Sequence, residues 1–136
     1  MHLSVVTLGV SDLLRSTAFY EAVGWQRLDA SSEQITFFQL GAVVLGLFGH
    51  DELVEDAAQP HAPASGFRGV TLAINFSSPA EVDRVVAEFV AVGARMVKQP
   101  TLVEWGGYSG YIADPDGHLW EIAFNPYSPE WAAPQR

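Results

Sequence analysis

The side chains of this 136-residue chain that could do chemistry are few in kind. It contains four histidines and no cysteine, which excludes disulfide scaffolds, zinc–thiolate sites, iron–sulfur clusters and cysteine nucleophiles. No glycine pattern fits a phosphate-binding loop or a dinucleotide fingerprint. Ser109 has a glycine on one side only, and no histidine is placed to activate it, so a serine nucleophile is not supported. What remains is chemistry by carboxylates and binding by aromatic rings.

Glu121 is the carboxylate best placed for such chemistry. Leu119 and Ala123 share its face of a predicted strand, and Trp120 and Ile122 lie on the other face. A carboxylate on a mostly apolar strand is costly unless it is paired or faces a wet cavity. Glu121 could therefore be a general base, an acceptor for the N–H or cation of a ligand, or a structural remnant paired with a buried hydroxyl or arginine.

Aromatic side chains are the second candidate feature, although most of them must fill the core. Trp105 precedes two glycines, where it could cap a pocket or present a stacking face. The expected pocket is apolar and aromatic, with four polar points at Thr7, Tyr108, Tyr111 and Glu121. The full set of predicted ligand-binding residues is Val5, Thr7, Phe38, Gly46, Phe48, Gly69, Trp105, Tyr108 and Tyr111.

The elements that must position these residues occur in two copies. The sequence VTLGV at residues 6–10 returns as VTLAI at 70–74, an offset of 64, and Gly24 returns as Gly93, an offset of 69. Each half is predicted to contain one strand, one helix that ends at a glycine, and then three strands. The halves span about residues 1–49 and 67–126.

Capping signals predict where the two helices begin. Ser11 or Asp12 can cap the first helix, whose expected apolar stripe consists of Leu14, Ala18, Phe19, Ala22 and Val23. Ser78 to Glu81 forms a capping box, with proline at the first helical position of the second helix. The expected apolar stripe of that helix is Val82, Val85, Val86, Phe89 and Val90.

Alternation and turn residues predict the remaining strands at 35–40, 42–48, 95–103, 108–113 and 118–124. Residues 114–117, Asp-Pro-Asp-Gly, read as a type I turn before the last strand. The segment 50–66 has no hydrophobic period and is predicted to be a linker or flap. Residues 127–136 are a proline-rich tail with no regular structure, which Tyr127 and Trp131 could pin to the surface.

Composition limits the partners. Hydrophobic residues make up 49% and charged residues 17%, as in a globular domain. Seven basic against sixteen acidic residues give a net charge of −9, which argues against nucleic acids and anionic membranes and is compatible with a cationic ligand. We expect a cytoplasmic protein, because no signal peptide and no apolar run long enough for a bilayer are visible.

The duplication, with Val-Ser-Asp-Leu at 10–13 and Asp-Pro-Asp-Gly-His-Leu-Trp-Glu at 114–121, resembles the vicinal oxygen chelate superfamily. This group holds glyoxalase I, extradiol dioxygenases, fosfomycin-resistance enzymes and bleomycin-binding proteins. The resemblance covers about residues 3–124 and implies an α+β fold of paired βαβββ modules within a single domain, residues 1–126. It also implies that each module curves into part of a barrel and that a homodimer forms.

The resemblance also implies where a metal would bind, two positions in each module. These fall on Val5, on Leu45 or Gly46, on Gly69 and on Glu121, and only the last has a ligand side chain. His2 and His118 are an odd step from Val5 and Glu121, so they face the other way in a regular strand. We therefore expect no metal and no other cofactor.

Three functions stay open. The first is a metal-free small-molecule binder of the bleomycin-resistance type. The second is a metal-independent isomerase or lyase that uses Glu121 as a base. The third is a metal-dependent enzyme like lactoylglutathione lyase or a dioxygenase, against which the missing ligands speak.

Overall fold

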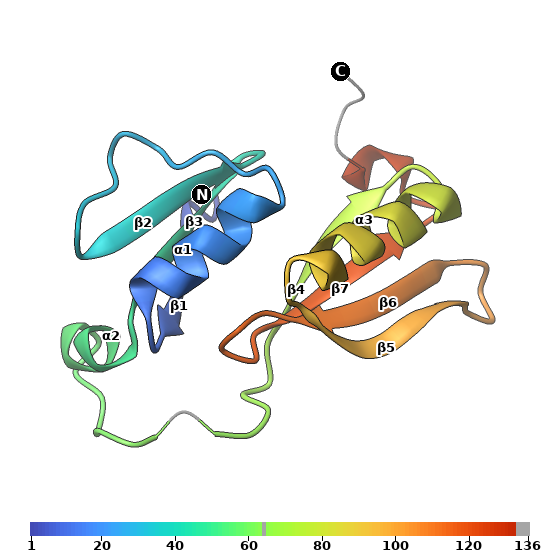
Figure 1. The fold of residues 1–136 in the computed structure, drawn as a ribbon. Coiled ribbons are helices and arrows are strands. Elements are labelled where there is room, and N and C mark those ends of the chain that lie inside the picture. The colour runs from blue at the N-terminus through green and yellow to red at the C-terminus, as the bar shows by residue number, and fades with distance from the viewer. Residues whose placement is uncertain (64, 133–136) are drawn as a thin grey trace. The chain divides into compact units, whose positions relative to one another are not determined.

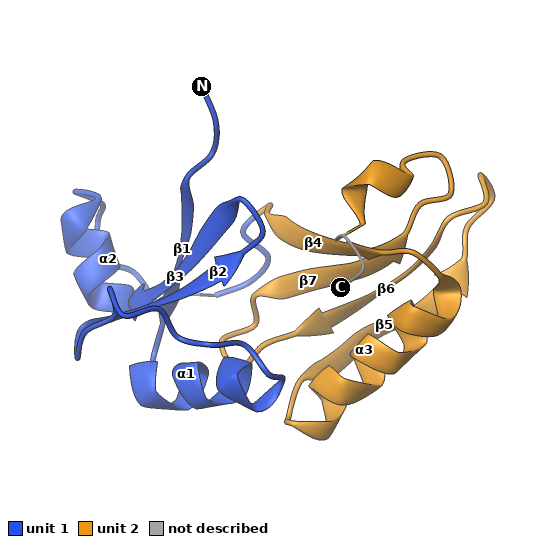
Figure 2. Ribbon diagram, turned by 90° about the horizontal axis from the view of Figure 1, so that it is seen from above, with its two compact units in different colours: residues 1–68 blue, residues 69–136 orange. Residues whose placement is uncertain are grey.

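The computed structural model describes residues 1–63 and 65–132. It divides into two compact units, Met1–Arg68 and Gly69–Arg136, which Figure 2 shows in blue and orange. Each unit has its own sheet and its own covering helix. They are described separately below. Within the described residues, no helix is long and apolar enough to cross a membrane.

Unit 1 is built around a three-stranded sheet with the order β1-β3-β2 (Figure 1). Strand β1 (Val5–Val10) runs parallel to β3 (Val43–Gly49), and β2 (Ile35–Leu40) forms a hairpin with β3. Helix α1 (Leu13–Ala22) lies on one face of this sheet, and a short helix α2 (His50–Asp56) follows β3.

Unit 2 repeats the plan with one more strand, in the order β4-β7-β6-β5. Strand β4 (Thr71–Phe76) runs parallel to β7 (Leu119–Phe124), while β6 (Tyr108–Ala113) and β5 (Arg95–Leu102) continue the sheet antiparallel. Helix α3 (Pro79–Ala91) covers one face, and a 3₁₀ turn η1 (Pro129–Trp131) ends the described chain. In Figure 2, α3 and η1 lie on opposite sides of this sheet.

The predicted helix starts are confirmed. Asp12 caps α1 by accepting a hydrogen bond from the Arg15 backbone N–H, and Ser78 caps α3 in the same way from Glu81. Both helices are followed by a glycine of positive φ, Gly24 at 100° and Gly93 at 111°. Glycine adopts this left-handed conformation without the steric penalty of a side chain, so the chain can turn away from the helix there.

The predicted apolar stripe of α1 is wrong except at Phe19, which is buried. The buried residues of α1 are Ser16, Thr17, Phe19 and Tyr20, whereas Leu14 is 82% exposed. Burial of polar side chains is possible because the Thr17 and Thr36 hydroxyls, on α1 and β2, lie 2.8 Å apart and satisfy each other. The stripe of α3 is confirmed except at its end, where Val90 is exposed.

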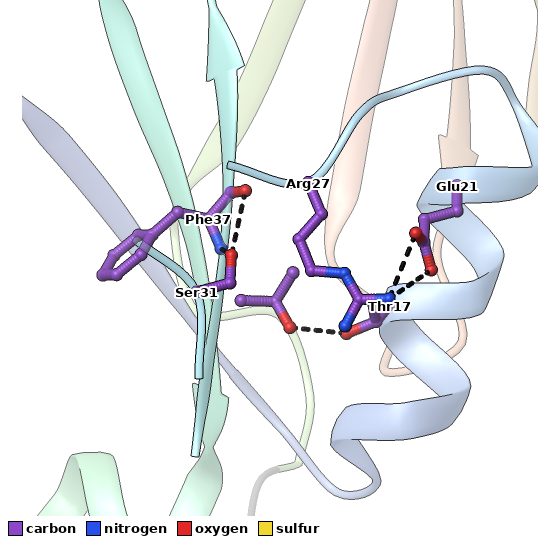
Figure 3. Close-up of polar contacts among 6 residues, drawn as sticks. Thr17, Glu21, Arg27, Ser31 and Phe37 are labelled. Carbon is purple, nitrogen blue, oxygen red and sulfur yellow. Dashed lines mark hydrogen bonds and ion pairs between the residues drawn. The ribbon is translucent and has the colours of Figure 1, made fainter. Parts of the chain in front are cut away.

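The first half lacks the third strand expected after α1. Residues in this segment form a loop that makes a single bridge, Arg27 to Phe38. Polar contacts hold the loop instead (Figure 3): the Arg27 guanidinium pairs with Glu21 at 3.3 Å, and the Ser31 hydroxyl accepts from the Phe37 N–H at 2.9 Å.

Two other segments are more regular than predicted. Seven residues of the expected linker form α2, which begins with Asp51 and Glu52 in its first turn, where carboxylates favour a helix. The expected irregular tail contains η1, in which proline occupies a first-turn position that needs no N–H donor.

The structure also corrects the alignment of the repeat. Strands β1 and β4 both have six residues, and the distance from Val5 to Thr71 equals the distance between the caps Asp12 and Ser78, 66 residues. The sequence match at an offset of 64 was therefore two residues short. Side chains alternate along a strand with a period of two residues. An error of two residues in the offset therefore leaves each strand residue assigned to the correct face of its sheet.

Candidate functional site

In unit 2 the sheet has a covered face and an open face. Trp120 and Ile122 of β7 are buried on the side of α3, so Leu119, Glu121 and Ala123 face the opposite side. The ladder places residues of two neighbouring strands beside them on this open face: Thr71, Ala73 and Asn75 of β4, and Ser109 and Tyr111 of β6. The predicted orientation of Glu121 is confirmed.

Glu121 lies directly opposite Tyr111 in the ladder. The Tyr111 hydroxyl donates a hydrogen bond to the Glu121 carboxylate, and the Thr71 hydroxyl supplies a hydrogen bond to Tyr111. Burial raises the pKa of Tyr111 above its ordinary value of 10.0, the charge of Glu121 raises it further, and the contact with Thr71 lowers it in part. Tyr111 is thus a permanent hydrogen-bond donor at neutral pH.

A cavity of about 400 Å³ opens beside this pair on the same face. Its polar lining comes from three strands and the segment after β7: Asn75, Ser109, Glu121 and Asn125. Its aromatic lining is Trp105, Tyr108, Phe124 and Trp131. A concave, mostly apolar site with a few convergent polar groups is typical of a small-molecule pocket.

Trp105 is positioned by the glycines that follow it. Gly106 has φ of 103°, and a Cβ at Gly107 would overlap the Trp105 indole, so the ring lies directly over the Gly107 backbone. The ring also approaches Tyr127, with 6.3 Å between ring centroids. Trp105 is one of the residues that line the cavity.

Trp131 was not predicted as a binding residue. It belongs to η1, and the next residue, Ala132, forms a parallel bridge to Asn75 of β4. This bridge holds the tail against the edge of the sheet, and Trp131 lines the cavity although it is 64% exposed. The role of Trp131 could not be predicted from the proline-rich sequence, because a single 3₁₀ turn is too short to produce a hydrophobic period. The polar wall residues Asn75, Ser109 and Asn125 were also missed, although alternation in the predicted strand 108–113 places Ser109 on the face of Tyr111.

Tyr108 is a lining residue of the cavity, but its side chain is directed toward α3, because it alternates with Ser109 of the open face. Its hydroxyl donates to the Asp83 carboxylate of α3 at 2.6 Å, and this hydrogen bond raises the pKa of Tyr108 above 10.0, with desolvation and the charge of Asp83 adding to it. The hydroxyl was expected to be a polar point of the pocket. It instead ties β6 to the covering helix.

In unit 1 the predicted residues Val5, Thr7, Gly46 and Phe48 share the face of the sheet opposite α1, and α2 packs against this face at Gly9. Phe38 lies on the covered face, is fully buried, and has ring centroids 6.0 Å from Tyr20 and 5.9 Å from Trp25. Phe38 therefore belongs to the core of unit 1. Its neighbour Phe37 lies on the face opposite α1, across from Gly46 in the ladder.

The corrected alignment fixes the four positions at which the resemblance implies metal ligands. Val5 corresponds to Thr71, and their ladder partners Val44 and Leu119 make Gly46 the counterpart of Glu121. Gly69, the predicted equivalent of Val5, precedes β4 and is not in the ladder.

The residues at these four positions do not fit a divalent metal. Val5 and Gly46 have no donor atom, Thr71 offers a hydroxyl, and Glu121 is already bonded to Tyr111. The open side of Gly46 is also filled, since a Cβ there would lie 3.3 Å from both the Phe37 ring and the Thr7 hydroxyl. Among residues 1–63 and 65–132, no three histidine or carboxylate side chains gather as metal ligands do.

Comparison with known proteins agrees with this architecture. The profile described as Glyoxalase/Bleomycin resistance protein/Dioxygenase superfamily matches residues 2–122. A glyoxalase-related enzyme from Fulvimarina pelagi is similar in structure, with a TM-score of 0.82 and 36% identity over 92% of this chain and 88% of that chain.

Two further solved structures are similar. A glyoxalase/bleomycin resistance protein/dioxygenase family enzyme from Burkholderia phytofirmans PsJN has 25% identity over 91% of this chain and 98% of its own, with a TM-score of 0.79. A lactoylglutathione lyase from Agrobacterium tumefaciens has 26% identity over 91% and 93%, with a TM-score of 0.67. Among curated proteins none matches significantly. The chain belongs to the glyoxalase/bleomycin resistance protein/dioxygenase superfamily.

Proposed function

We propose that this protein binds a small organic molecule in the cavity of unit 2 and does so without a catalytic metal. The observation that carries the proposal is the cavity itself: about 400 Å³, walled by aromatic rings, with the Glu121 carboxylate at its side. Apolar walls supply most of the binding energy in such sites, and a few polar groups fix the orientation of the ligand.

The hydrogen bond from Tyr111 is compatible with a role of Glu121 in ligand recognition. A carboxylate accepts at about four lone-pair sites, so one donor leaves acceptor capacity for a ligand. The same hydrogen bond holds the carboxylate in place, which lowers the entropy lost when a ligand binds. Asn75, Ser109 and Asn125 on the same cavity wall add amide and hydroxyl groups to this recognition surface.

A second candidate is a metal-independent isomerase or lyase in which Glu121 removes a proton. It is supported by the same placement, because a base must lie within reach of the proton that it takes. A metal-dependent reaction, the third possibility, receives no support from the four implied positions, because Val5 and Gly46 have no donor atom.

The test combines a thermal-shift screen with the variant Glu121→Gln. A ligand that binds the folded protein raises its melting temperature by linkage. For a binder, Glu121→Gln keeps most of its affinity for a neutral hit, whereas a base-dependent enzyme loses turnover with little change in binding. Glu33→Gln, an exposed site in unit 1, controls for the lost charge. A screen in which no compound stabilises the wild type through this cavity would refute the proposal.

A further inference from the structure

We infer that the cavity selects organic cations, with Glu121 as the counter-charge and the indoles of Trp105 and Trp131 as the recognition faces. The inference rests on the proposed function, because it concerns the same cavity. It adds the chemical class of the ligand and assigns a binding role to the tail that carries Trp131.

Charge is the first step. Of the described residues that line the cavity, Glu121 alone carries a formal charge at neutral pH. Lys98 lies opposite Tyr111 in the neighbouring strand but is not a lining residue. The whole chain carries a net charge of −9, so the surrounding field also favours a cation. A neutral ligand that covers Glu121 would leave the carboxylate with less compensation for the water that it displaces.

The indoles are the second step. Trp105 is 54% and Trp131 64% exposed, yet both line the cavity. They reach it from different directions, one from the loop after β5 and the other from η1. A cation over the face of an indole is attracted by the ring quadrupole, and indole is the best aromatic partner for it. Two indoles and a carboxylate around one cavity therefore match an amine or quaternary ammonium group.

The backbone under each indole is the third step. Trp105 lies over Gly107, where any Cβ would overlap the ring, so only glycine permits this ring position. Trp131 is held by the Ala132–Asn75 bridge. The fold thus holds the Trp105 ring, and the backbone that carries Trp131, before a ligand arrives, which reduces the ordering cost of binding.

The experiment uses choline and its uncharged carbon isostere 3,3-dimethylbutan-1-ol as probes of the full chain, at matched ionic strength. The four tryptophans give four indole N–H resonances, which single Trp→Phe variants assign. Choline should shift the resonances of Trp105 and Trp131, and leave that of Trp120, which is 2% exposed in the core, unchanged. We expect choline to bind at least about fivefold more tightly than the isostere.

Three variants test the parts. Glu121→Gln should reduce the preference for choline to about twofold or less. Trp131→Ala should weaken choline binding about fivefold. Gly107→Ala should weaken it as well, although it removes no binding atom, because it displaces Trp105. Phe67→Ala, which removes an exposed ring in unit 1, is the matched control and should change nothing. Thermal melts of each variant verify folding.

The outcomes separate this inference from the proposed function. Equal affinities for the two probes, or a choline preference that survives Glu121→Gln, overturn the cation assignment. If choline leaves both indoles unchanged while a neutral compound from the screen shifts them, the cavity binds ligands but not cations, and only this inference fails. If no compound perturbs either indole, both proposals fail.

Discussion

The Tyr111 hydroxyl stands between a donor, Thr71, and an acceptor, Glu121, on neighbouring strands. The equivalent place in unit 1 has the same geometry without the polar groups, since Phe37 pairs with Gly46 as Tyr111 pairs with Glu121. One copy of the repeat therefore keeps a carboxylate with a bound hydroxyl, and the other fills the same position with a phenyl ring. This divergence concentrates polar recognition in unit 2.

The raised pKa of Tyr111 predicts a dependence of stability on alkaline pH. Because the folded protein holds this proton more tightly than the unfolded chain, stability is fully present below about pH 10 and falls as the pH rises through the folded pKa. Tyr111→Phe should flatten part of this fall. Urea unfolding at several pH values between 8 and 11.5 measures it, with Tyr127→Phe as the control. An unchanged slope in Tyr111→Phe would contradict the prediction.

Individual site residues were predictable where strand alternation decides the matter. Glu121 and Thr7 lie on the faces that a period of two gives. Phe38 was assigned to the ligand by residue type, although the same period places it with the buried Thr36 on the covered side. Gly69 was misplaced because the sequence match at residues 6–10 and 70–74 has an offset of 64, whereas the strands and the helix caps of the two copies are related by 66 residues.

At the scale of elements, α3 depends on a well-formed N-terminus. Ser78 accepts from the Glu81 N–H at 3.2 Å, and Glu81 accepts from the Ser77 N–H at 2.9 Å and from its hydroxyl at 2.7 Å. Each contact satisfies a donor that the first turn leaves without a helical partner or fixes the chain that enters it. Since α3 covers the face opposite the cavity, its docking supports the strands that line the site.

Removal of this cap should be measurable. Ser78→Ala is expected to lower the free energy of unfolding by about 1 kcal/mol, the usual loss for a serine cap. The midpoint of urea unfolding should fall with no change in its slope, because the surface exposed on unfolding is unaffected. Ser4→Ala, at an exposed position before β1, is the control. A midpoint equal to that of the wild type would show that the cap is dispensable.

Elements whose ends are set by local hydrogen bonds were predicted well. Elements that depend on tertiary contacts were not. The caps at Asp12 and Ser78 and the turn at Asp114 are local devices; the Asp114 carboxylate accepts from the Asp116 and His118 N–H groups at 2.9 Å. By contrast, α2 and η1 lie in segments with no hydrophobic period. The missing strand of the first half reflects a loop held by side-chain contacts that no pattern encodes.

For the whole molecule, association into a homodimer remains a prediction. Large apolar side chains are exposed in both units, among them Phe67 at 68% and Leu102 at 71%, and such surface favours burial against a partner. Sedimentation equilibrium should give a mass of twice the chain mass of 14.8 kDa. A mass that stays at the monomer value at high protein concentration would contradict it.

The expected independence from metals is also a property of the whole chain. Of the four implied ligand positions, Val5 and Gly46 are in unit 1, and Thr71 and Glu121 are in unit 2. A metal that bound the folded state would raise the melting temperature in proportion to the logarithm of its concentration over Kd. With one carboxylate and one hydroxyl among these positions, we expect Ni²⁺, Zn²⁺ and Mn²⁺ to leave the melting temperature and the affinity for cavity ligands unchanged. Dialysis against EDTA should have no effect on either quantity. A saturable rise that disappears in Glu121→Gln, with one metal per chain by elemental analysis, would place an ion at Glu121 and overturn the expectation.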